Sequence, residues 1–356
     1  MSKMTGQIKD IGSLLDSASP ILPVPEVEEL AREIFGLPAR ASELTGERDR
    51  NFHLEADGSH YVLKVSNPAE DRQVIRFQTE ALLHIAAVDA SLPVPRVIPT
   101  RAGEHEWVLD CAGGTSLVIR ILSFLEGDPL HRISSSTRLR RNLGNHLARL
   151  DLALRGFFHP AAGHELMWDM KHASRVRDLL EHIPDLSQRS LAERFLDNFE
   201  THALPVLPRL RAQVIHNDLN PHNVLIEPGE PERIAGIIDF GDMVHAPLIN
   251  NLAVAAAYQV MPGGHPLETA ADLIAGYHAV SPLEPGEIDI LFDLIATRMV
   301  LTVTITGWRA ARYPENRSYI LRNNPQAWAG LERLATLSRR DAQAYLHHVC
   351  ATEKPS

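Results

Sequence analysis

Two stretches in the first third of the chain carry apolar residues at the spacing of an amphipathic helix. Residues 24–35 repeat apolar positions three and four residues apart, and Gly36 follows as a stop signal. Residues 68–88 show the same spacing, until Pro93 and Pro95 interrupt the chain. The pattern therefore predicts two helices. The strands predicted from the shorter apolar runs lie between these two helices and after the second one.

Shorter apolar runs predict a sheet around these helices. Runs at residues 52–56 and 59–65 flank Asp57 and Gly58, a pair that tolerates the positive φ angles of a tight hairpin turn. Residues 117–125 are nearly all apolar, which is typical of a strand covered on both faces. Further strands are expected at residues 96–99, 107–109 and 116–122.

In the remaining two thirds of the chain the apolar spacing is mainly helical, and a β-rich stretch at residues 212–240 interrupts it. We therefore expect an α+β protein with an irregular segment over residues 1–22, a small lobe over residues 23–126 and a larger lobe over residues 127–356. Residues 124–129 are the expected hinge. Helical spacing occurs at residues 133–155, 169–181, 188–203, 247–261, 266–280, 285–311 and 325–349.

Composition excludes several classes of protein. The 356 residues carry a formal net charge of −10, and the pI is about 6.0, which argues against binding to nucleic acid or to an anionic membrane. The chain has 2 cysteines, Cys111 and Cys350, so we expect no disulfide framework and no Cys-rich zinc site. No apolar leader begins the sequence and no run is long enough to span a membrane. A cytoplasmic protein is expected, and the sequence does not indicate its oligomeric state.

The β-rich stretch contains the residues that point to chemistry. Apolar runs lead to His216 and Asp218, and Asn223 follows five residues after the aspartate. A further apolar run ends sixteen residues after Asn223 at Asp239, which opens the sequence Asp-Phe-Gly. The order H-x-D-x-x-x-x-N and then D-F-G is that of the kinase catalytic loop and its metal-binding aspartate. Single Asp and Asn residues are common in turns, but the complete spaced set at strand ends favours phosphotransfer.

Phosphoryl transfer explains these residue types, because the negative charge that spreads over the phosphoryl oxygens must be neutralised by cations. We expect Asp218 to accept or orient the proton of the attacking hydroxyl. Asn223 and Asp239 are expected to offer oxygen ligands to Mg²⁺, which prefers such hard donors. His216 is expected to brace the loop. A zinc site made of His216, His222 and His245 is a weaker alternative, because chance clustering is easy among 18 histidines and no helical His-x-x-x-His face supports it.

The predicted hairpin offers a basic group for the nucleotide phosphates. Lys64 lies in its second strand, and Glu80 lies on the predicted helix that follows. A strand lysine paired with a helix glutamate holds the α- and β-phosphates in kinases. We therefore predict a pair between Lys64 and Glu80, with Glu70 and Asp71 as alternative partners for the lysine.

Other nucleotide contacts are expected from the loop before the hairpin and from the hinge. The loop contains Gly46 but lacks the G-x-G-x-x-G pattern of protein kinases, so Arg48, Arg50 and Asn51 are expected to contribute side chains instead. A plain solvated turn is the alternative for this loop. At the hinge, Phe124 and Leu125 are predicted to contact the nucleotide.

The spaced motif resembles the aminoglycoside phosphotransferase/choline kinase-like family, whose members are bilobal small-molecule kinases related to protein kinases. Asn217 stands where protein kinases have an arginine, and no A-P-E segment follows the D-F-G, so a protein substrate is not expected. Residues 49–53, 157–160 with 168–172, and 241–245 are similar to the branch that contains hydroxylysine kinase and the kinase domains fused to class III aminotransferases. The similarity covers most of residues 45–320.

The resemblance implies a protein-kinase-like fold, with a small antiparallel-sheet lobe and a larger, mainly helical lobe. It also implies transfer of the γ-phosphate of ATP or GTP to the hydroxyl of a hydroxy amino acid or amino alcohol, with 5-hydroxylysine as the first choice. Homoserine, choline and aminoglycosides are alternative acceptors. A non-catalytic nucleotide-binding module is the alternative from another class, although the intact set of Lys64, Asp218, Asn223 and Asp239 argues against it.

A zwitterionic hydroxy amino acid requires partners for both of its charges near Asp218. Candidate ammonium acceptors are Asp242 and Asp169. Arg298 and Arg309 are candidates for a bidentate clamp on a carboxylate, whereas a strongly acidic groove would favour polycationic aminoglycosides. Aromatic walls with cation–π contact to an ammonium group are expected from Trp168, Tyr258 and Trp308.

Overall fold

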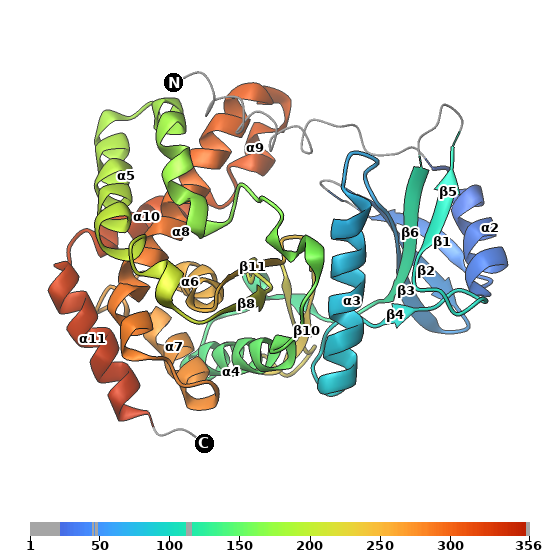
Figure 1. The fold of residues 1–356 in the computed structure, drawn as a ribbon, viewed down its shortest axis with the longest axis horizontal. Helices are drawn as coiled ribbons and strands as arrows, with labels where there is room; N and C mark the ends of the chain where they lie inside the picture. The colour runs from blue at the N-terminus through green and yellow to red at the C-terminus, as the bar shows by residue number, and fades with distance from the viewer. Residues whose placement is uncertain (1–21, 45, 47–48, 112–115, 354–356) are drawn as a thin grey trace.

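The computed structural model describes residues 22–44, 46, 49–111 and 116–353, and these residues form two lobes of unequal size (Figure 1). The smaller lobe contains an antiparallel sheet, and the larger lobe is mainly helical. The predicted α+β, two-lobed architecture is confirmed. In the described part of the chain, every helix is too short or too polar to cross a membrane.

The sheet of the small lobe has the strand order β1-β2-β3-β6-β4, with β5 paired to β6. The predicted hairpin is present, since Asp57 and Gly58 have φ angles of 50° and 73° between β2 and β3. β1 was not expected, because its sequence RASEL is polar and its strand is exposed along much of its length. The strands are β1 (Arg40–Leu44), β2 (Arg50–Ala56), β3 (Ser59–Val65), β4 (Val97–Ile98), β5 (Trp107–Asp110) and β6 (Ser116–Ser123).

Two helices flank this sheet, and they belong to different apolar cores. Helix α2 (Val24–Phe35) packs with the buried side chains Phe52 and Leu63 in a core of the small lobe. Helix α3 (Arg72–Val88) places its apolar side chains, among them Phe77, in the large core that continues through the other lobe. Figure 1 shows α3 between the sheet and the larger lobe. The contact of α3 with the sheet includes buried polar groups, because Arg120 on β6 donates hydrogen bonds to side chains of α3.

Period-two alternation decides which strand residues face the cleft. Phe52 and Leu63 are cross-strand partners and point into the core with α2. Asn51 and Lys64 are the adjacent partners in the register, so they point to the opposite face, where the cavity between the lobes lies.

The larger lobe is built around α8 (Pro285–Arg312), which is buried along most of its length. The expected helix over residues 285–311 is therefore confirmed. The expected helix over residues 325–349 is wrong as one element, because Ser338 caps a new helix by accepting a hydrogen bond from the backbone N–H of Asp341. The remaining α-helices are α4 (Thr137–Leu154), α5 (Leu186–Asn198), α6 (Ile249–Ala257), α7 (Glu268–Val280), α9 (Arg317–Ile320), α10 (Asn324–Leu334) and α11 (Arg339–Thr352).

Short strands interrupt the helices where the β-rich stretch was predicted. β8 pairs with β11, while β9 pairs with both β10 and β7. The loop between β8 and β9 carries the predicted catalytic residues. The strands are β7 (Asp128–Pro129), β8 (Ala212–Ile215), β9 (Val224–Ile226), β10 (Ile234–Ile237) and β11 (Val244–Pro247). Tighter or wider helical turns occur at η1 (Leu130–Arg132), η2 (Pro160–Gly163), η3 (Met170–His182), η4 (Phe199–Ala203), η5 (Leu207–Arg209) and η6 (Pro314–Asn316).

Candidate active site

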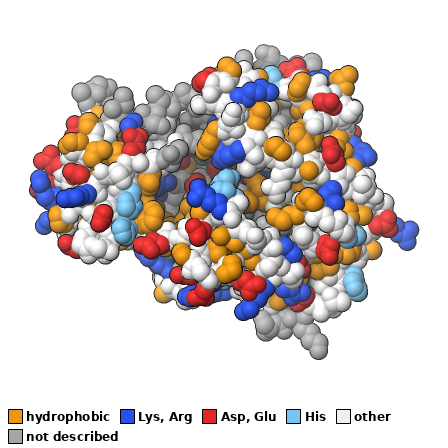
Figure 2. Space-filling model, turned by 180° about the vertical axis from the view of Figure 1, so that it is seen from behind, with side chains coloured by type: hydrophobic (Ala, Val, Ile, Leu, Met, Phe, Trp, Pro, Cys, Tyr) orange, Lys and Arg blue, Asp and Glu red, His pale blue; other side chains and the backbone are white. Residues whose placement is uncertain are grey.

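A cavity of about 400 Å³ is lined by residues of both lobes. Seen from behind in Figure 2, the narrow waist between the lobes is hollowed, and acidic and basic side chains are interspersed over this face. Ten of the predicted site residues line the cavity. They are Asn51, Lys64, Trp168, Asp218, Asn223, Asp239, Asp242, Tyr258, Arg298 and Arg309.

Asp218 is at the centre of a hydrogen-bond network on the catalytic loop. Its Oδ2 accepts hydrogen bonds from the side-chain amides of Asn220 and Asn223, each at 2.8 Å. Its Oδ1 accepts one from Nη2 of Arg298 at 3.0 Å. Burial raises the pKa of Asp218 to about 7, the positive charge of Arg298 acts in the opposite direction, and nearby Asp242 and Asp239 add to the rise. A carboxylate in this setting is oriented on both oxygens and is poised to titrate near neutrality.

Two motif residues have backbone conformations that non-glycine residues rarely adopt. Asn217 has a φ angle of 64° and Asp239 a φ angle of 63°. Among non-glycine residues of the described chain, only the turn residue Asp57 shares this left-handed conformation. Such strain persists where the surrounding structure enforces it, and it is concentrated at functional sites. Asn217 directly precedes Asp218, the predicted base, and Asp239 is itself a predicted ligand of Mg²⁺.

His216 links the catalytic loop to the segment that carries Asp239. Its Nδ1 accepts a hydrogen bond from the backbone N–H of Asp218, and its Nε2 lies 3.2 Å from the carbonyl oxygen of Ile238. The ring packs edge-on against Phe240, with 4.8 Å between centroids. Burial lowers the pKa of His216, which keeps the ring neutral and suits it to one accepted and one donated bond. The contacts are those expected of a residue that braces the loop.

A buried polar chain behind the loop was not found from the sequence. The backbone N–H of Asn217 donates to Oδ1 of Asn251, whose Nδ2 donates to Oδ1 of Asp151 at 2.6 Å. The hydroxyl of Tyr277 donates to the other carboxylate oxygen of Asp151 at 2.7 Å. Burial raises the pKa of Asp151 to about 7, against the effect of these two donors. The chain connects α4, α6 and α7 to the strained residue next to Asp218.

Asn223 and Asp239 present suitable oxygens for a divalent cation. Both hydrogens of the Asn223 amide are used on Asp218, at its backbone oxygen and at Oδ2, so the amide oxygen is left to face a ligand. Asp239 is exposed, and its Oδ1 accepts a hydrogen bond from the backbone N–H of Gly241. These two hard oxygens fit a Mg²⁺ ion that takes its other ligands from phosphates and water. The described residues contain no cluster of three His, Cys, Asp or Glu side chains for a metal, so the zinc alternative has no support.

The predicted pair between Lys64 and Glu80 is wrong. Nζ of Lys64 lies 3.2 Å from Oδ2 of Asp49, the residue just before β2. Glu80 instead accepts a hydrogen bond from Arg76 at 2.8 Å on α3 and lies 3.7 Å from Nε2 of His159. Glu70, named as an alternative, lines the cavity, and Asp71 caps α3 by accepting a hydrogen bond from a backbone N–H.

Several other predicted residues lie outside the cavity lining. Arg50 pairs with Glu43 across the strands at 2.9 Å. At the hinge, the Phe124 ring packs edge-on against His53, and Leu125 packs against Gly236. These three side chains are therefore committed to neighbours beside the cavity. Arg48, which was predicted with Arg50, lies outside the described residues.

Two predicted acceptor residues are also placed elsewhere. Asp169 is fully buried, caps η3 and pairs with Lys171 at 2.8 Å. Trp308 is buried beneath the guanidinium of Arg312, which lies 5.1 Å from its ring centroid. Neither side chain lines the cavity, so the expectation that they contact an acceptor is wrong for this arrangement.

Helix α8 supplies one wall of the cavity through residues that share a helical face. Arg298, Thr302, Thr306 and Arg309 are spaced four, four and three residues apart, and all line the cavity. The Arg298 guanidinium lies 5.2 Å from the ring centroid of Trp168 and 5.9 Å from that of Tyr258. The expected clamp of Arg298 with Arg309 must therefore be revised, because Arg298 already pairs with Asp218.

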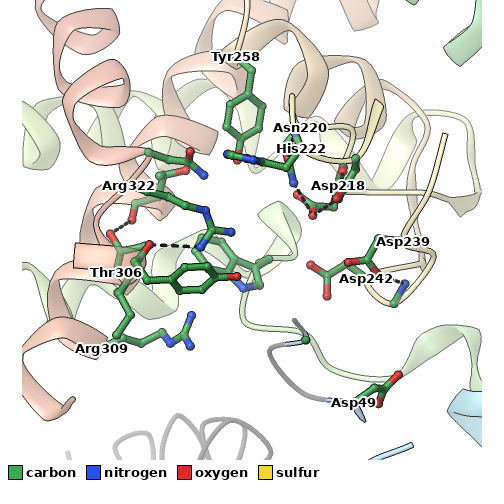
Figure 3. Close-up of a pocket in the computed structure, with 18 of the residues that line it drawn as sticks. Asp49, Asp218, Asn220, His222, Asp239, Asp242, Tyr258, Thr306, Arg309 and Arg322 are labelled. Atoms are coloured by element: carbon green, nitrogen blue, oxygen red, sulfur yellow. Dashed lines mark hydrogen bonds between the residues drawn. The ribbon is translucent and has the colours of Figure 1, made fainter. Parts of the chain in front are cut away.

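The cavity has an acidic side and a basic side. In Figure 3, Asp218, Asp239 and Asp242 lie on one side, and Arg309 and Arg322 lie on the other. Arg322 comes from the turn between α9 and α10, where its guanidinium stacks on Tyr319 at 3.9 Å and donates to the Tyr319 carbonyl. No motif marks Arg322, so sequence reasoning had no signal for it. Asp49 and Asn220, by contrast, lie inside stretches that had been singled out.

Comparison with known proteins identifies the family. Residues 41–291 match the phosphotransferase enzyme family, abbreviated APH. The chain belongs to this family. It is therefore a phosphotransferase that uses an alcohol group as acceptor, and a small-molecule kinase, as the motif predicted.

Curated relatives agree over most of the chain. The sequence is 24% identical to hydroxylysine kinase of Mus musculus over 348 residues, which covers 91% of this kinase and 92% of the relative. It is 30% identical to homoserine kinase of Methylobacterium radiotolerans over 269 residues, covering 72% of this kinase and 77% of the relative. Both relatives are kinases of small hydroxyl-bearing molecules by name.

Solved structures show the same fold. A microcompartment-associated aminopropanol kinase superposes with a TM-score of 0.65 at 19% identity, covering 93% of this kinase and 100% of that chain. An amicoumacin kinase, solved with AMP-PNP, Ca²⁺ and its antibiotic, superposes with a TM-score of 0.63 at 14% identity, covering 96% and 99% of the two chains. The predicted kinase-like bilobal fold is confirmed.

Proposed function

We propose that this kinase transfers the γ-phosphate of a nucleoside triphosphate to the hydroxyl of a hydroxy amino acid or amino alcohol, with 5-hydroxylysine as the first candidate. One observation carries the proposal. Asp218, Asn223 and Asp239 converge on one cavity, and Lys64 faces the same cavity from the small lobe. Phosphoryl transfer requires cations that neutralise the phosphate oxygens and a base that accepts the proton of the attacking hydroxyl.

Asp218 is proposed to be the catalytic residue. Its two oxygens are held by Asn220, Asn223 and Arg298, so the carboxylate is fixed in direction before an acceptor arrives. In its ionised form it accepts the proton of the attacking hydroxyl as the oxygen bonds to the γ-phosphorus. The proton moves to a carboxylate oxygen, and the bond between the γ-phosphorus and the nucleoside diphosphate breaks. The products are the phosphate ester of the acceptor and the nucleoside diphosphate.

Asn223 and Asp239 are proposed to hold Mg²⁺ together with the nucleotide phosphates. The cation supplies positive charge to the phosphate oxygens when it is bound. The amicoumacin kinase, which shares the fold, was solved with AMP-PNP and Ca²⁺, which supports the use of a divalent cation with the nucleotide. Lys64 adds a further positive charge, from the lobe of residues 23–126, and we propose that it contacts the phosphates of ATP or GTP.

The acceptor is proposed to lie between the two sides of the cavity. Asp242 on the acidic side suits an ammonium group, and the rings of Trp168 and Tyr258 suit its aliphatic chain. Arg309 and Arg322 on the basic side suit a carboxylate. The arginines disfavour a polycationic aminoglycoside, whereas both charges of a hydroxy amino acid find a partner. The names of the hydroxylysine and homoserine kinase relatives support this class of acceptor.

A coupled assay of nucleoside diphosphate release tests the proposal. The purified chain is incubated with Mg²⁺, with ATP or GTP, and with 5-hydroxylysine, homoserine, 1-amino-2-propanol, choline or kanamycin in turn. We expect the highest kcat/KM with 5-hydroxylysine, and a higher kcat/KM for acceptors that carry a carboxylate than for 1-amino-2-propanol. A preference for choline or kanamycin would contradict the proposed acceptor class. Nucleotide binding without turnover on any acceptor would support a non-catalytic module instead.

A further inference from the structure

We propose that Asp49 orients Lys64 toward the nucleotide, the role that a helix glutamate has in other kinases. This inference rests on the proposed function of Lys64. Oδ2 of Asp49 lies 3.2 Å from Nζ of Lys64, and both side chains line the cavity. The exposed fractions are only 12% for Asp49 and 18% for Lys64, so solvent screens the pair weakly. The other carboxylate oxygen accepts the backbone N–H of Asn67 at 3.3 Å, which fixes the direction of the carboxylate.

The helix that usually supplies the carboxylate offers a different side chain here. Glu80 is committed to Arg76 and His159, and its side chain is 38% exposed. The side of α3 toward the sheet presents Gln78 and Thr79, which accept hydrogen bonds from Arg120 at 2.6 Å and 3.2 Å. A neutral amide and a hydroxyl cannot balance the charge of a lysine. The negative partner of Lys64 is therefore Asp49, which directly precedes β2 of the same sheet.

The arrangement of cations explains why a carboxylate is needed at this place. Lys64 on β3 and Arg120 on β6 are cross-strand partners, and like charges in that position repel. Burial alone would raise the pKa of Asp49, but the charges of Lys64 and Arg120 lower it below its usual value. Asp49 is thus an ionised group that offsets two neighbouring cations on the sheet.

The backbone before β2 is packed closely around Asp49. A Cβ atom added at Gly46 would lie 2.3 Å from the backbone oxygen of Asp49 and 2.7 Å from Nδ2 of Asn51. Only glycine allows this approach, so Gly46 and Asp49 are held against each other. Through its pair with Asp49, Lys64 is therefore held by the backbone that precedes β2 and not by α3.

Four variants test this inference by calorimetric titration with Mg²⁺ and ADP: Lys64→Ala, Asp49→Asn, the double variant and the matched control Glu80→Gln. We expect Lys64→Ala and Asp49→Asn each to weaken nucleotide binding by roughly tenfold, the effect of losing one charged contact. The double variant should bind about as well as Lys64→Ala alone, because the two residues act as a unit. Glu80→Gln should stay within about twofold of the unchanged chain.

Steady-state kinetics separate positioning from a loss of structure. Asp49→Asn should raise the KM for the nucleotide and leave the KM for the acceptor unchanged, and Asp49→Ser repeats the test if Asp49→Asn folds poorly by circular dichroism. Tighter or unchanged nucleotide binding by both Asp49 variants would overturn the inference, and so would a loss in Glu80→Gln equal to that in Asp49→Asn. If Lys64→Ala binds nucleotide normally, the proposed function of Lys64 fails, and the inference fails with it.

Discussion

The acidic and basic sides of the cavity differ in how the chain builds them. Asp218, Asp239 and Asp242 lie within 25 residues of one another on short strands and their loops. Arg309 and Arg322 come from α8 and the turn after α9. We propose that the acidic side carries the catalytic residues and that the basic side selects among acceptors. A change on the first is expected to stop every reaction, and a change on the second to alter which acceptor is used.

The largest effect is expected from Asp218→Asn. Loss of the base should lower kcat by roughly 10²–10⁴-fold for all acceptors, the usual contribution of a positioned base. The affinity for nucleotide should be largely unchanged, because Asp218 meets the acceptor rather than the triphosphate. Coupled-assay kinetics and nucleotide titration measure the two quantities. An equal loss of nucleotide affinity would place Asp218 among the metal ligands instead.

Asp239→Ala should abolish the dependence of nucleotide binding on Mg²⁺. Removing a carboxylate ligand should weaken Mg²⁺-dependent nucleotide binding by at least about 10–100-fold, the effect measured even for groups that only support metal ligands. Titrations of nucleotide at several Mg²⁺ concentrations measure it, with Asp178→Ala as a control on η3, away from the cavity lining. An unchanged Mg²⁺ titration would contradict the proposed role of Asp239.

Arg322→Met tests the basic side. Its guanidinium contacts Tyr319, three residues away in the same turn, so its loss should leave the fold intact. We expect the KM for a hydroxy amino acid to rise by about tenfold and the KM for 1-amino-2-propanol to stay constant, because only the former has a carboxylate to lose its partner. An equal change for both acceptors would show that the basic side does not read the carboxylate.

The smallest effect on turnover is expected for Asp151→Asn, which alters stability instead. Burial raises the pKa of Asp151 to about 7 in the folded chain, well above the usual range of an aspartate, so the folded state holds its proton more tightly. The folded state therefore loses stability as the pH rises from 4 to 7, by at most about 4 kcal/mol. Relative to Asp151→Asn, the unchanged chain should be most stable at pH 4 and should lose this advantage by pH 7. Urea unfolding of both proteins across this range measures the difference, and parallel curves would contradict it.

The parts of the site that were predictable are those where neighbours in sequence are neighbours in space. The catalytic loop and the D-F-G segment flank paired strands, so their spacing alone placed three side chains in one cavity. The hairpin at Asp57 and Gly58 is equally local, because its turn chemistry depends on two residues. The bounds of α8 followed from its long apolar pattern.

The predictions that were wrong or missing concern residues whose position depends on helix phase or on contacts between segments far apart in the sequence. Glu80 is two residues after Gln78, a rotation of about 200° around the helix, so only one of them can face the sheet. Trp308 and Arg309 are adjacent on α8, and only the arginine lines the cavity. Arg322 reaches the cavity through the packing of α9 and α10, which no periodicity in the sequence reveals.

The position of α3 determines which part of the small lobe can travel. Its apolar side chains are embedded in the core of the large lobe, and that core also includes Leu122 of β6, close to the hydrogen bonds that Arg120 donates to α3. Polar contacts can exchange partners with water as surfaces slide, but embedded apolar side chains resist separation. Sliding of the sheet across α3 would have to separate Leu122 from this core, so β6 and α3 are expected to move little against each other when spent nucleotide leaves. Lys64 lies on β3 and Asp49 directly precedes β2, so the two residues are expected to move together and to keep their ion pair.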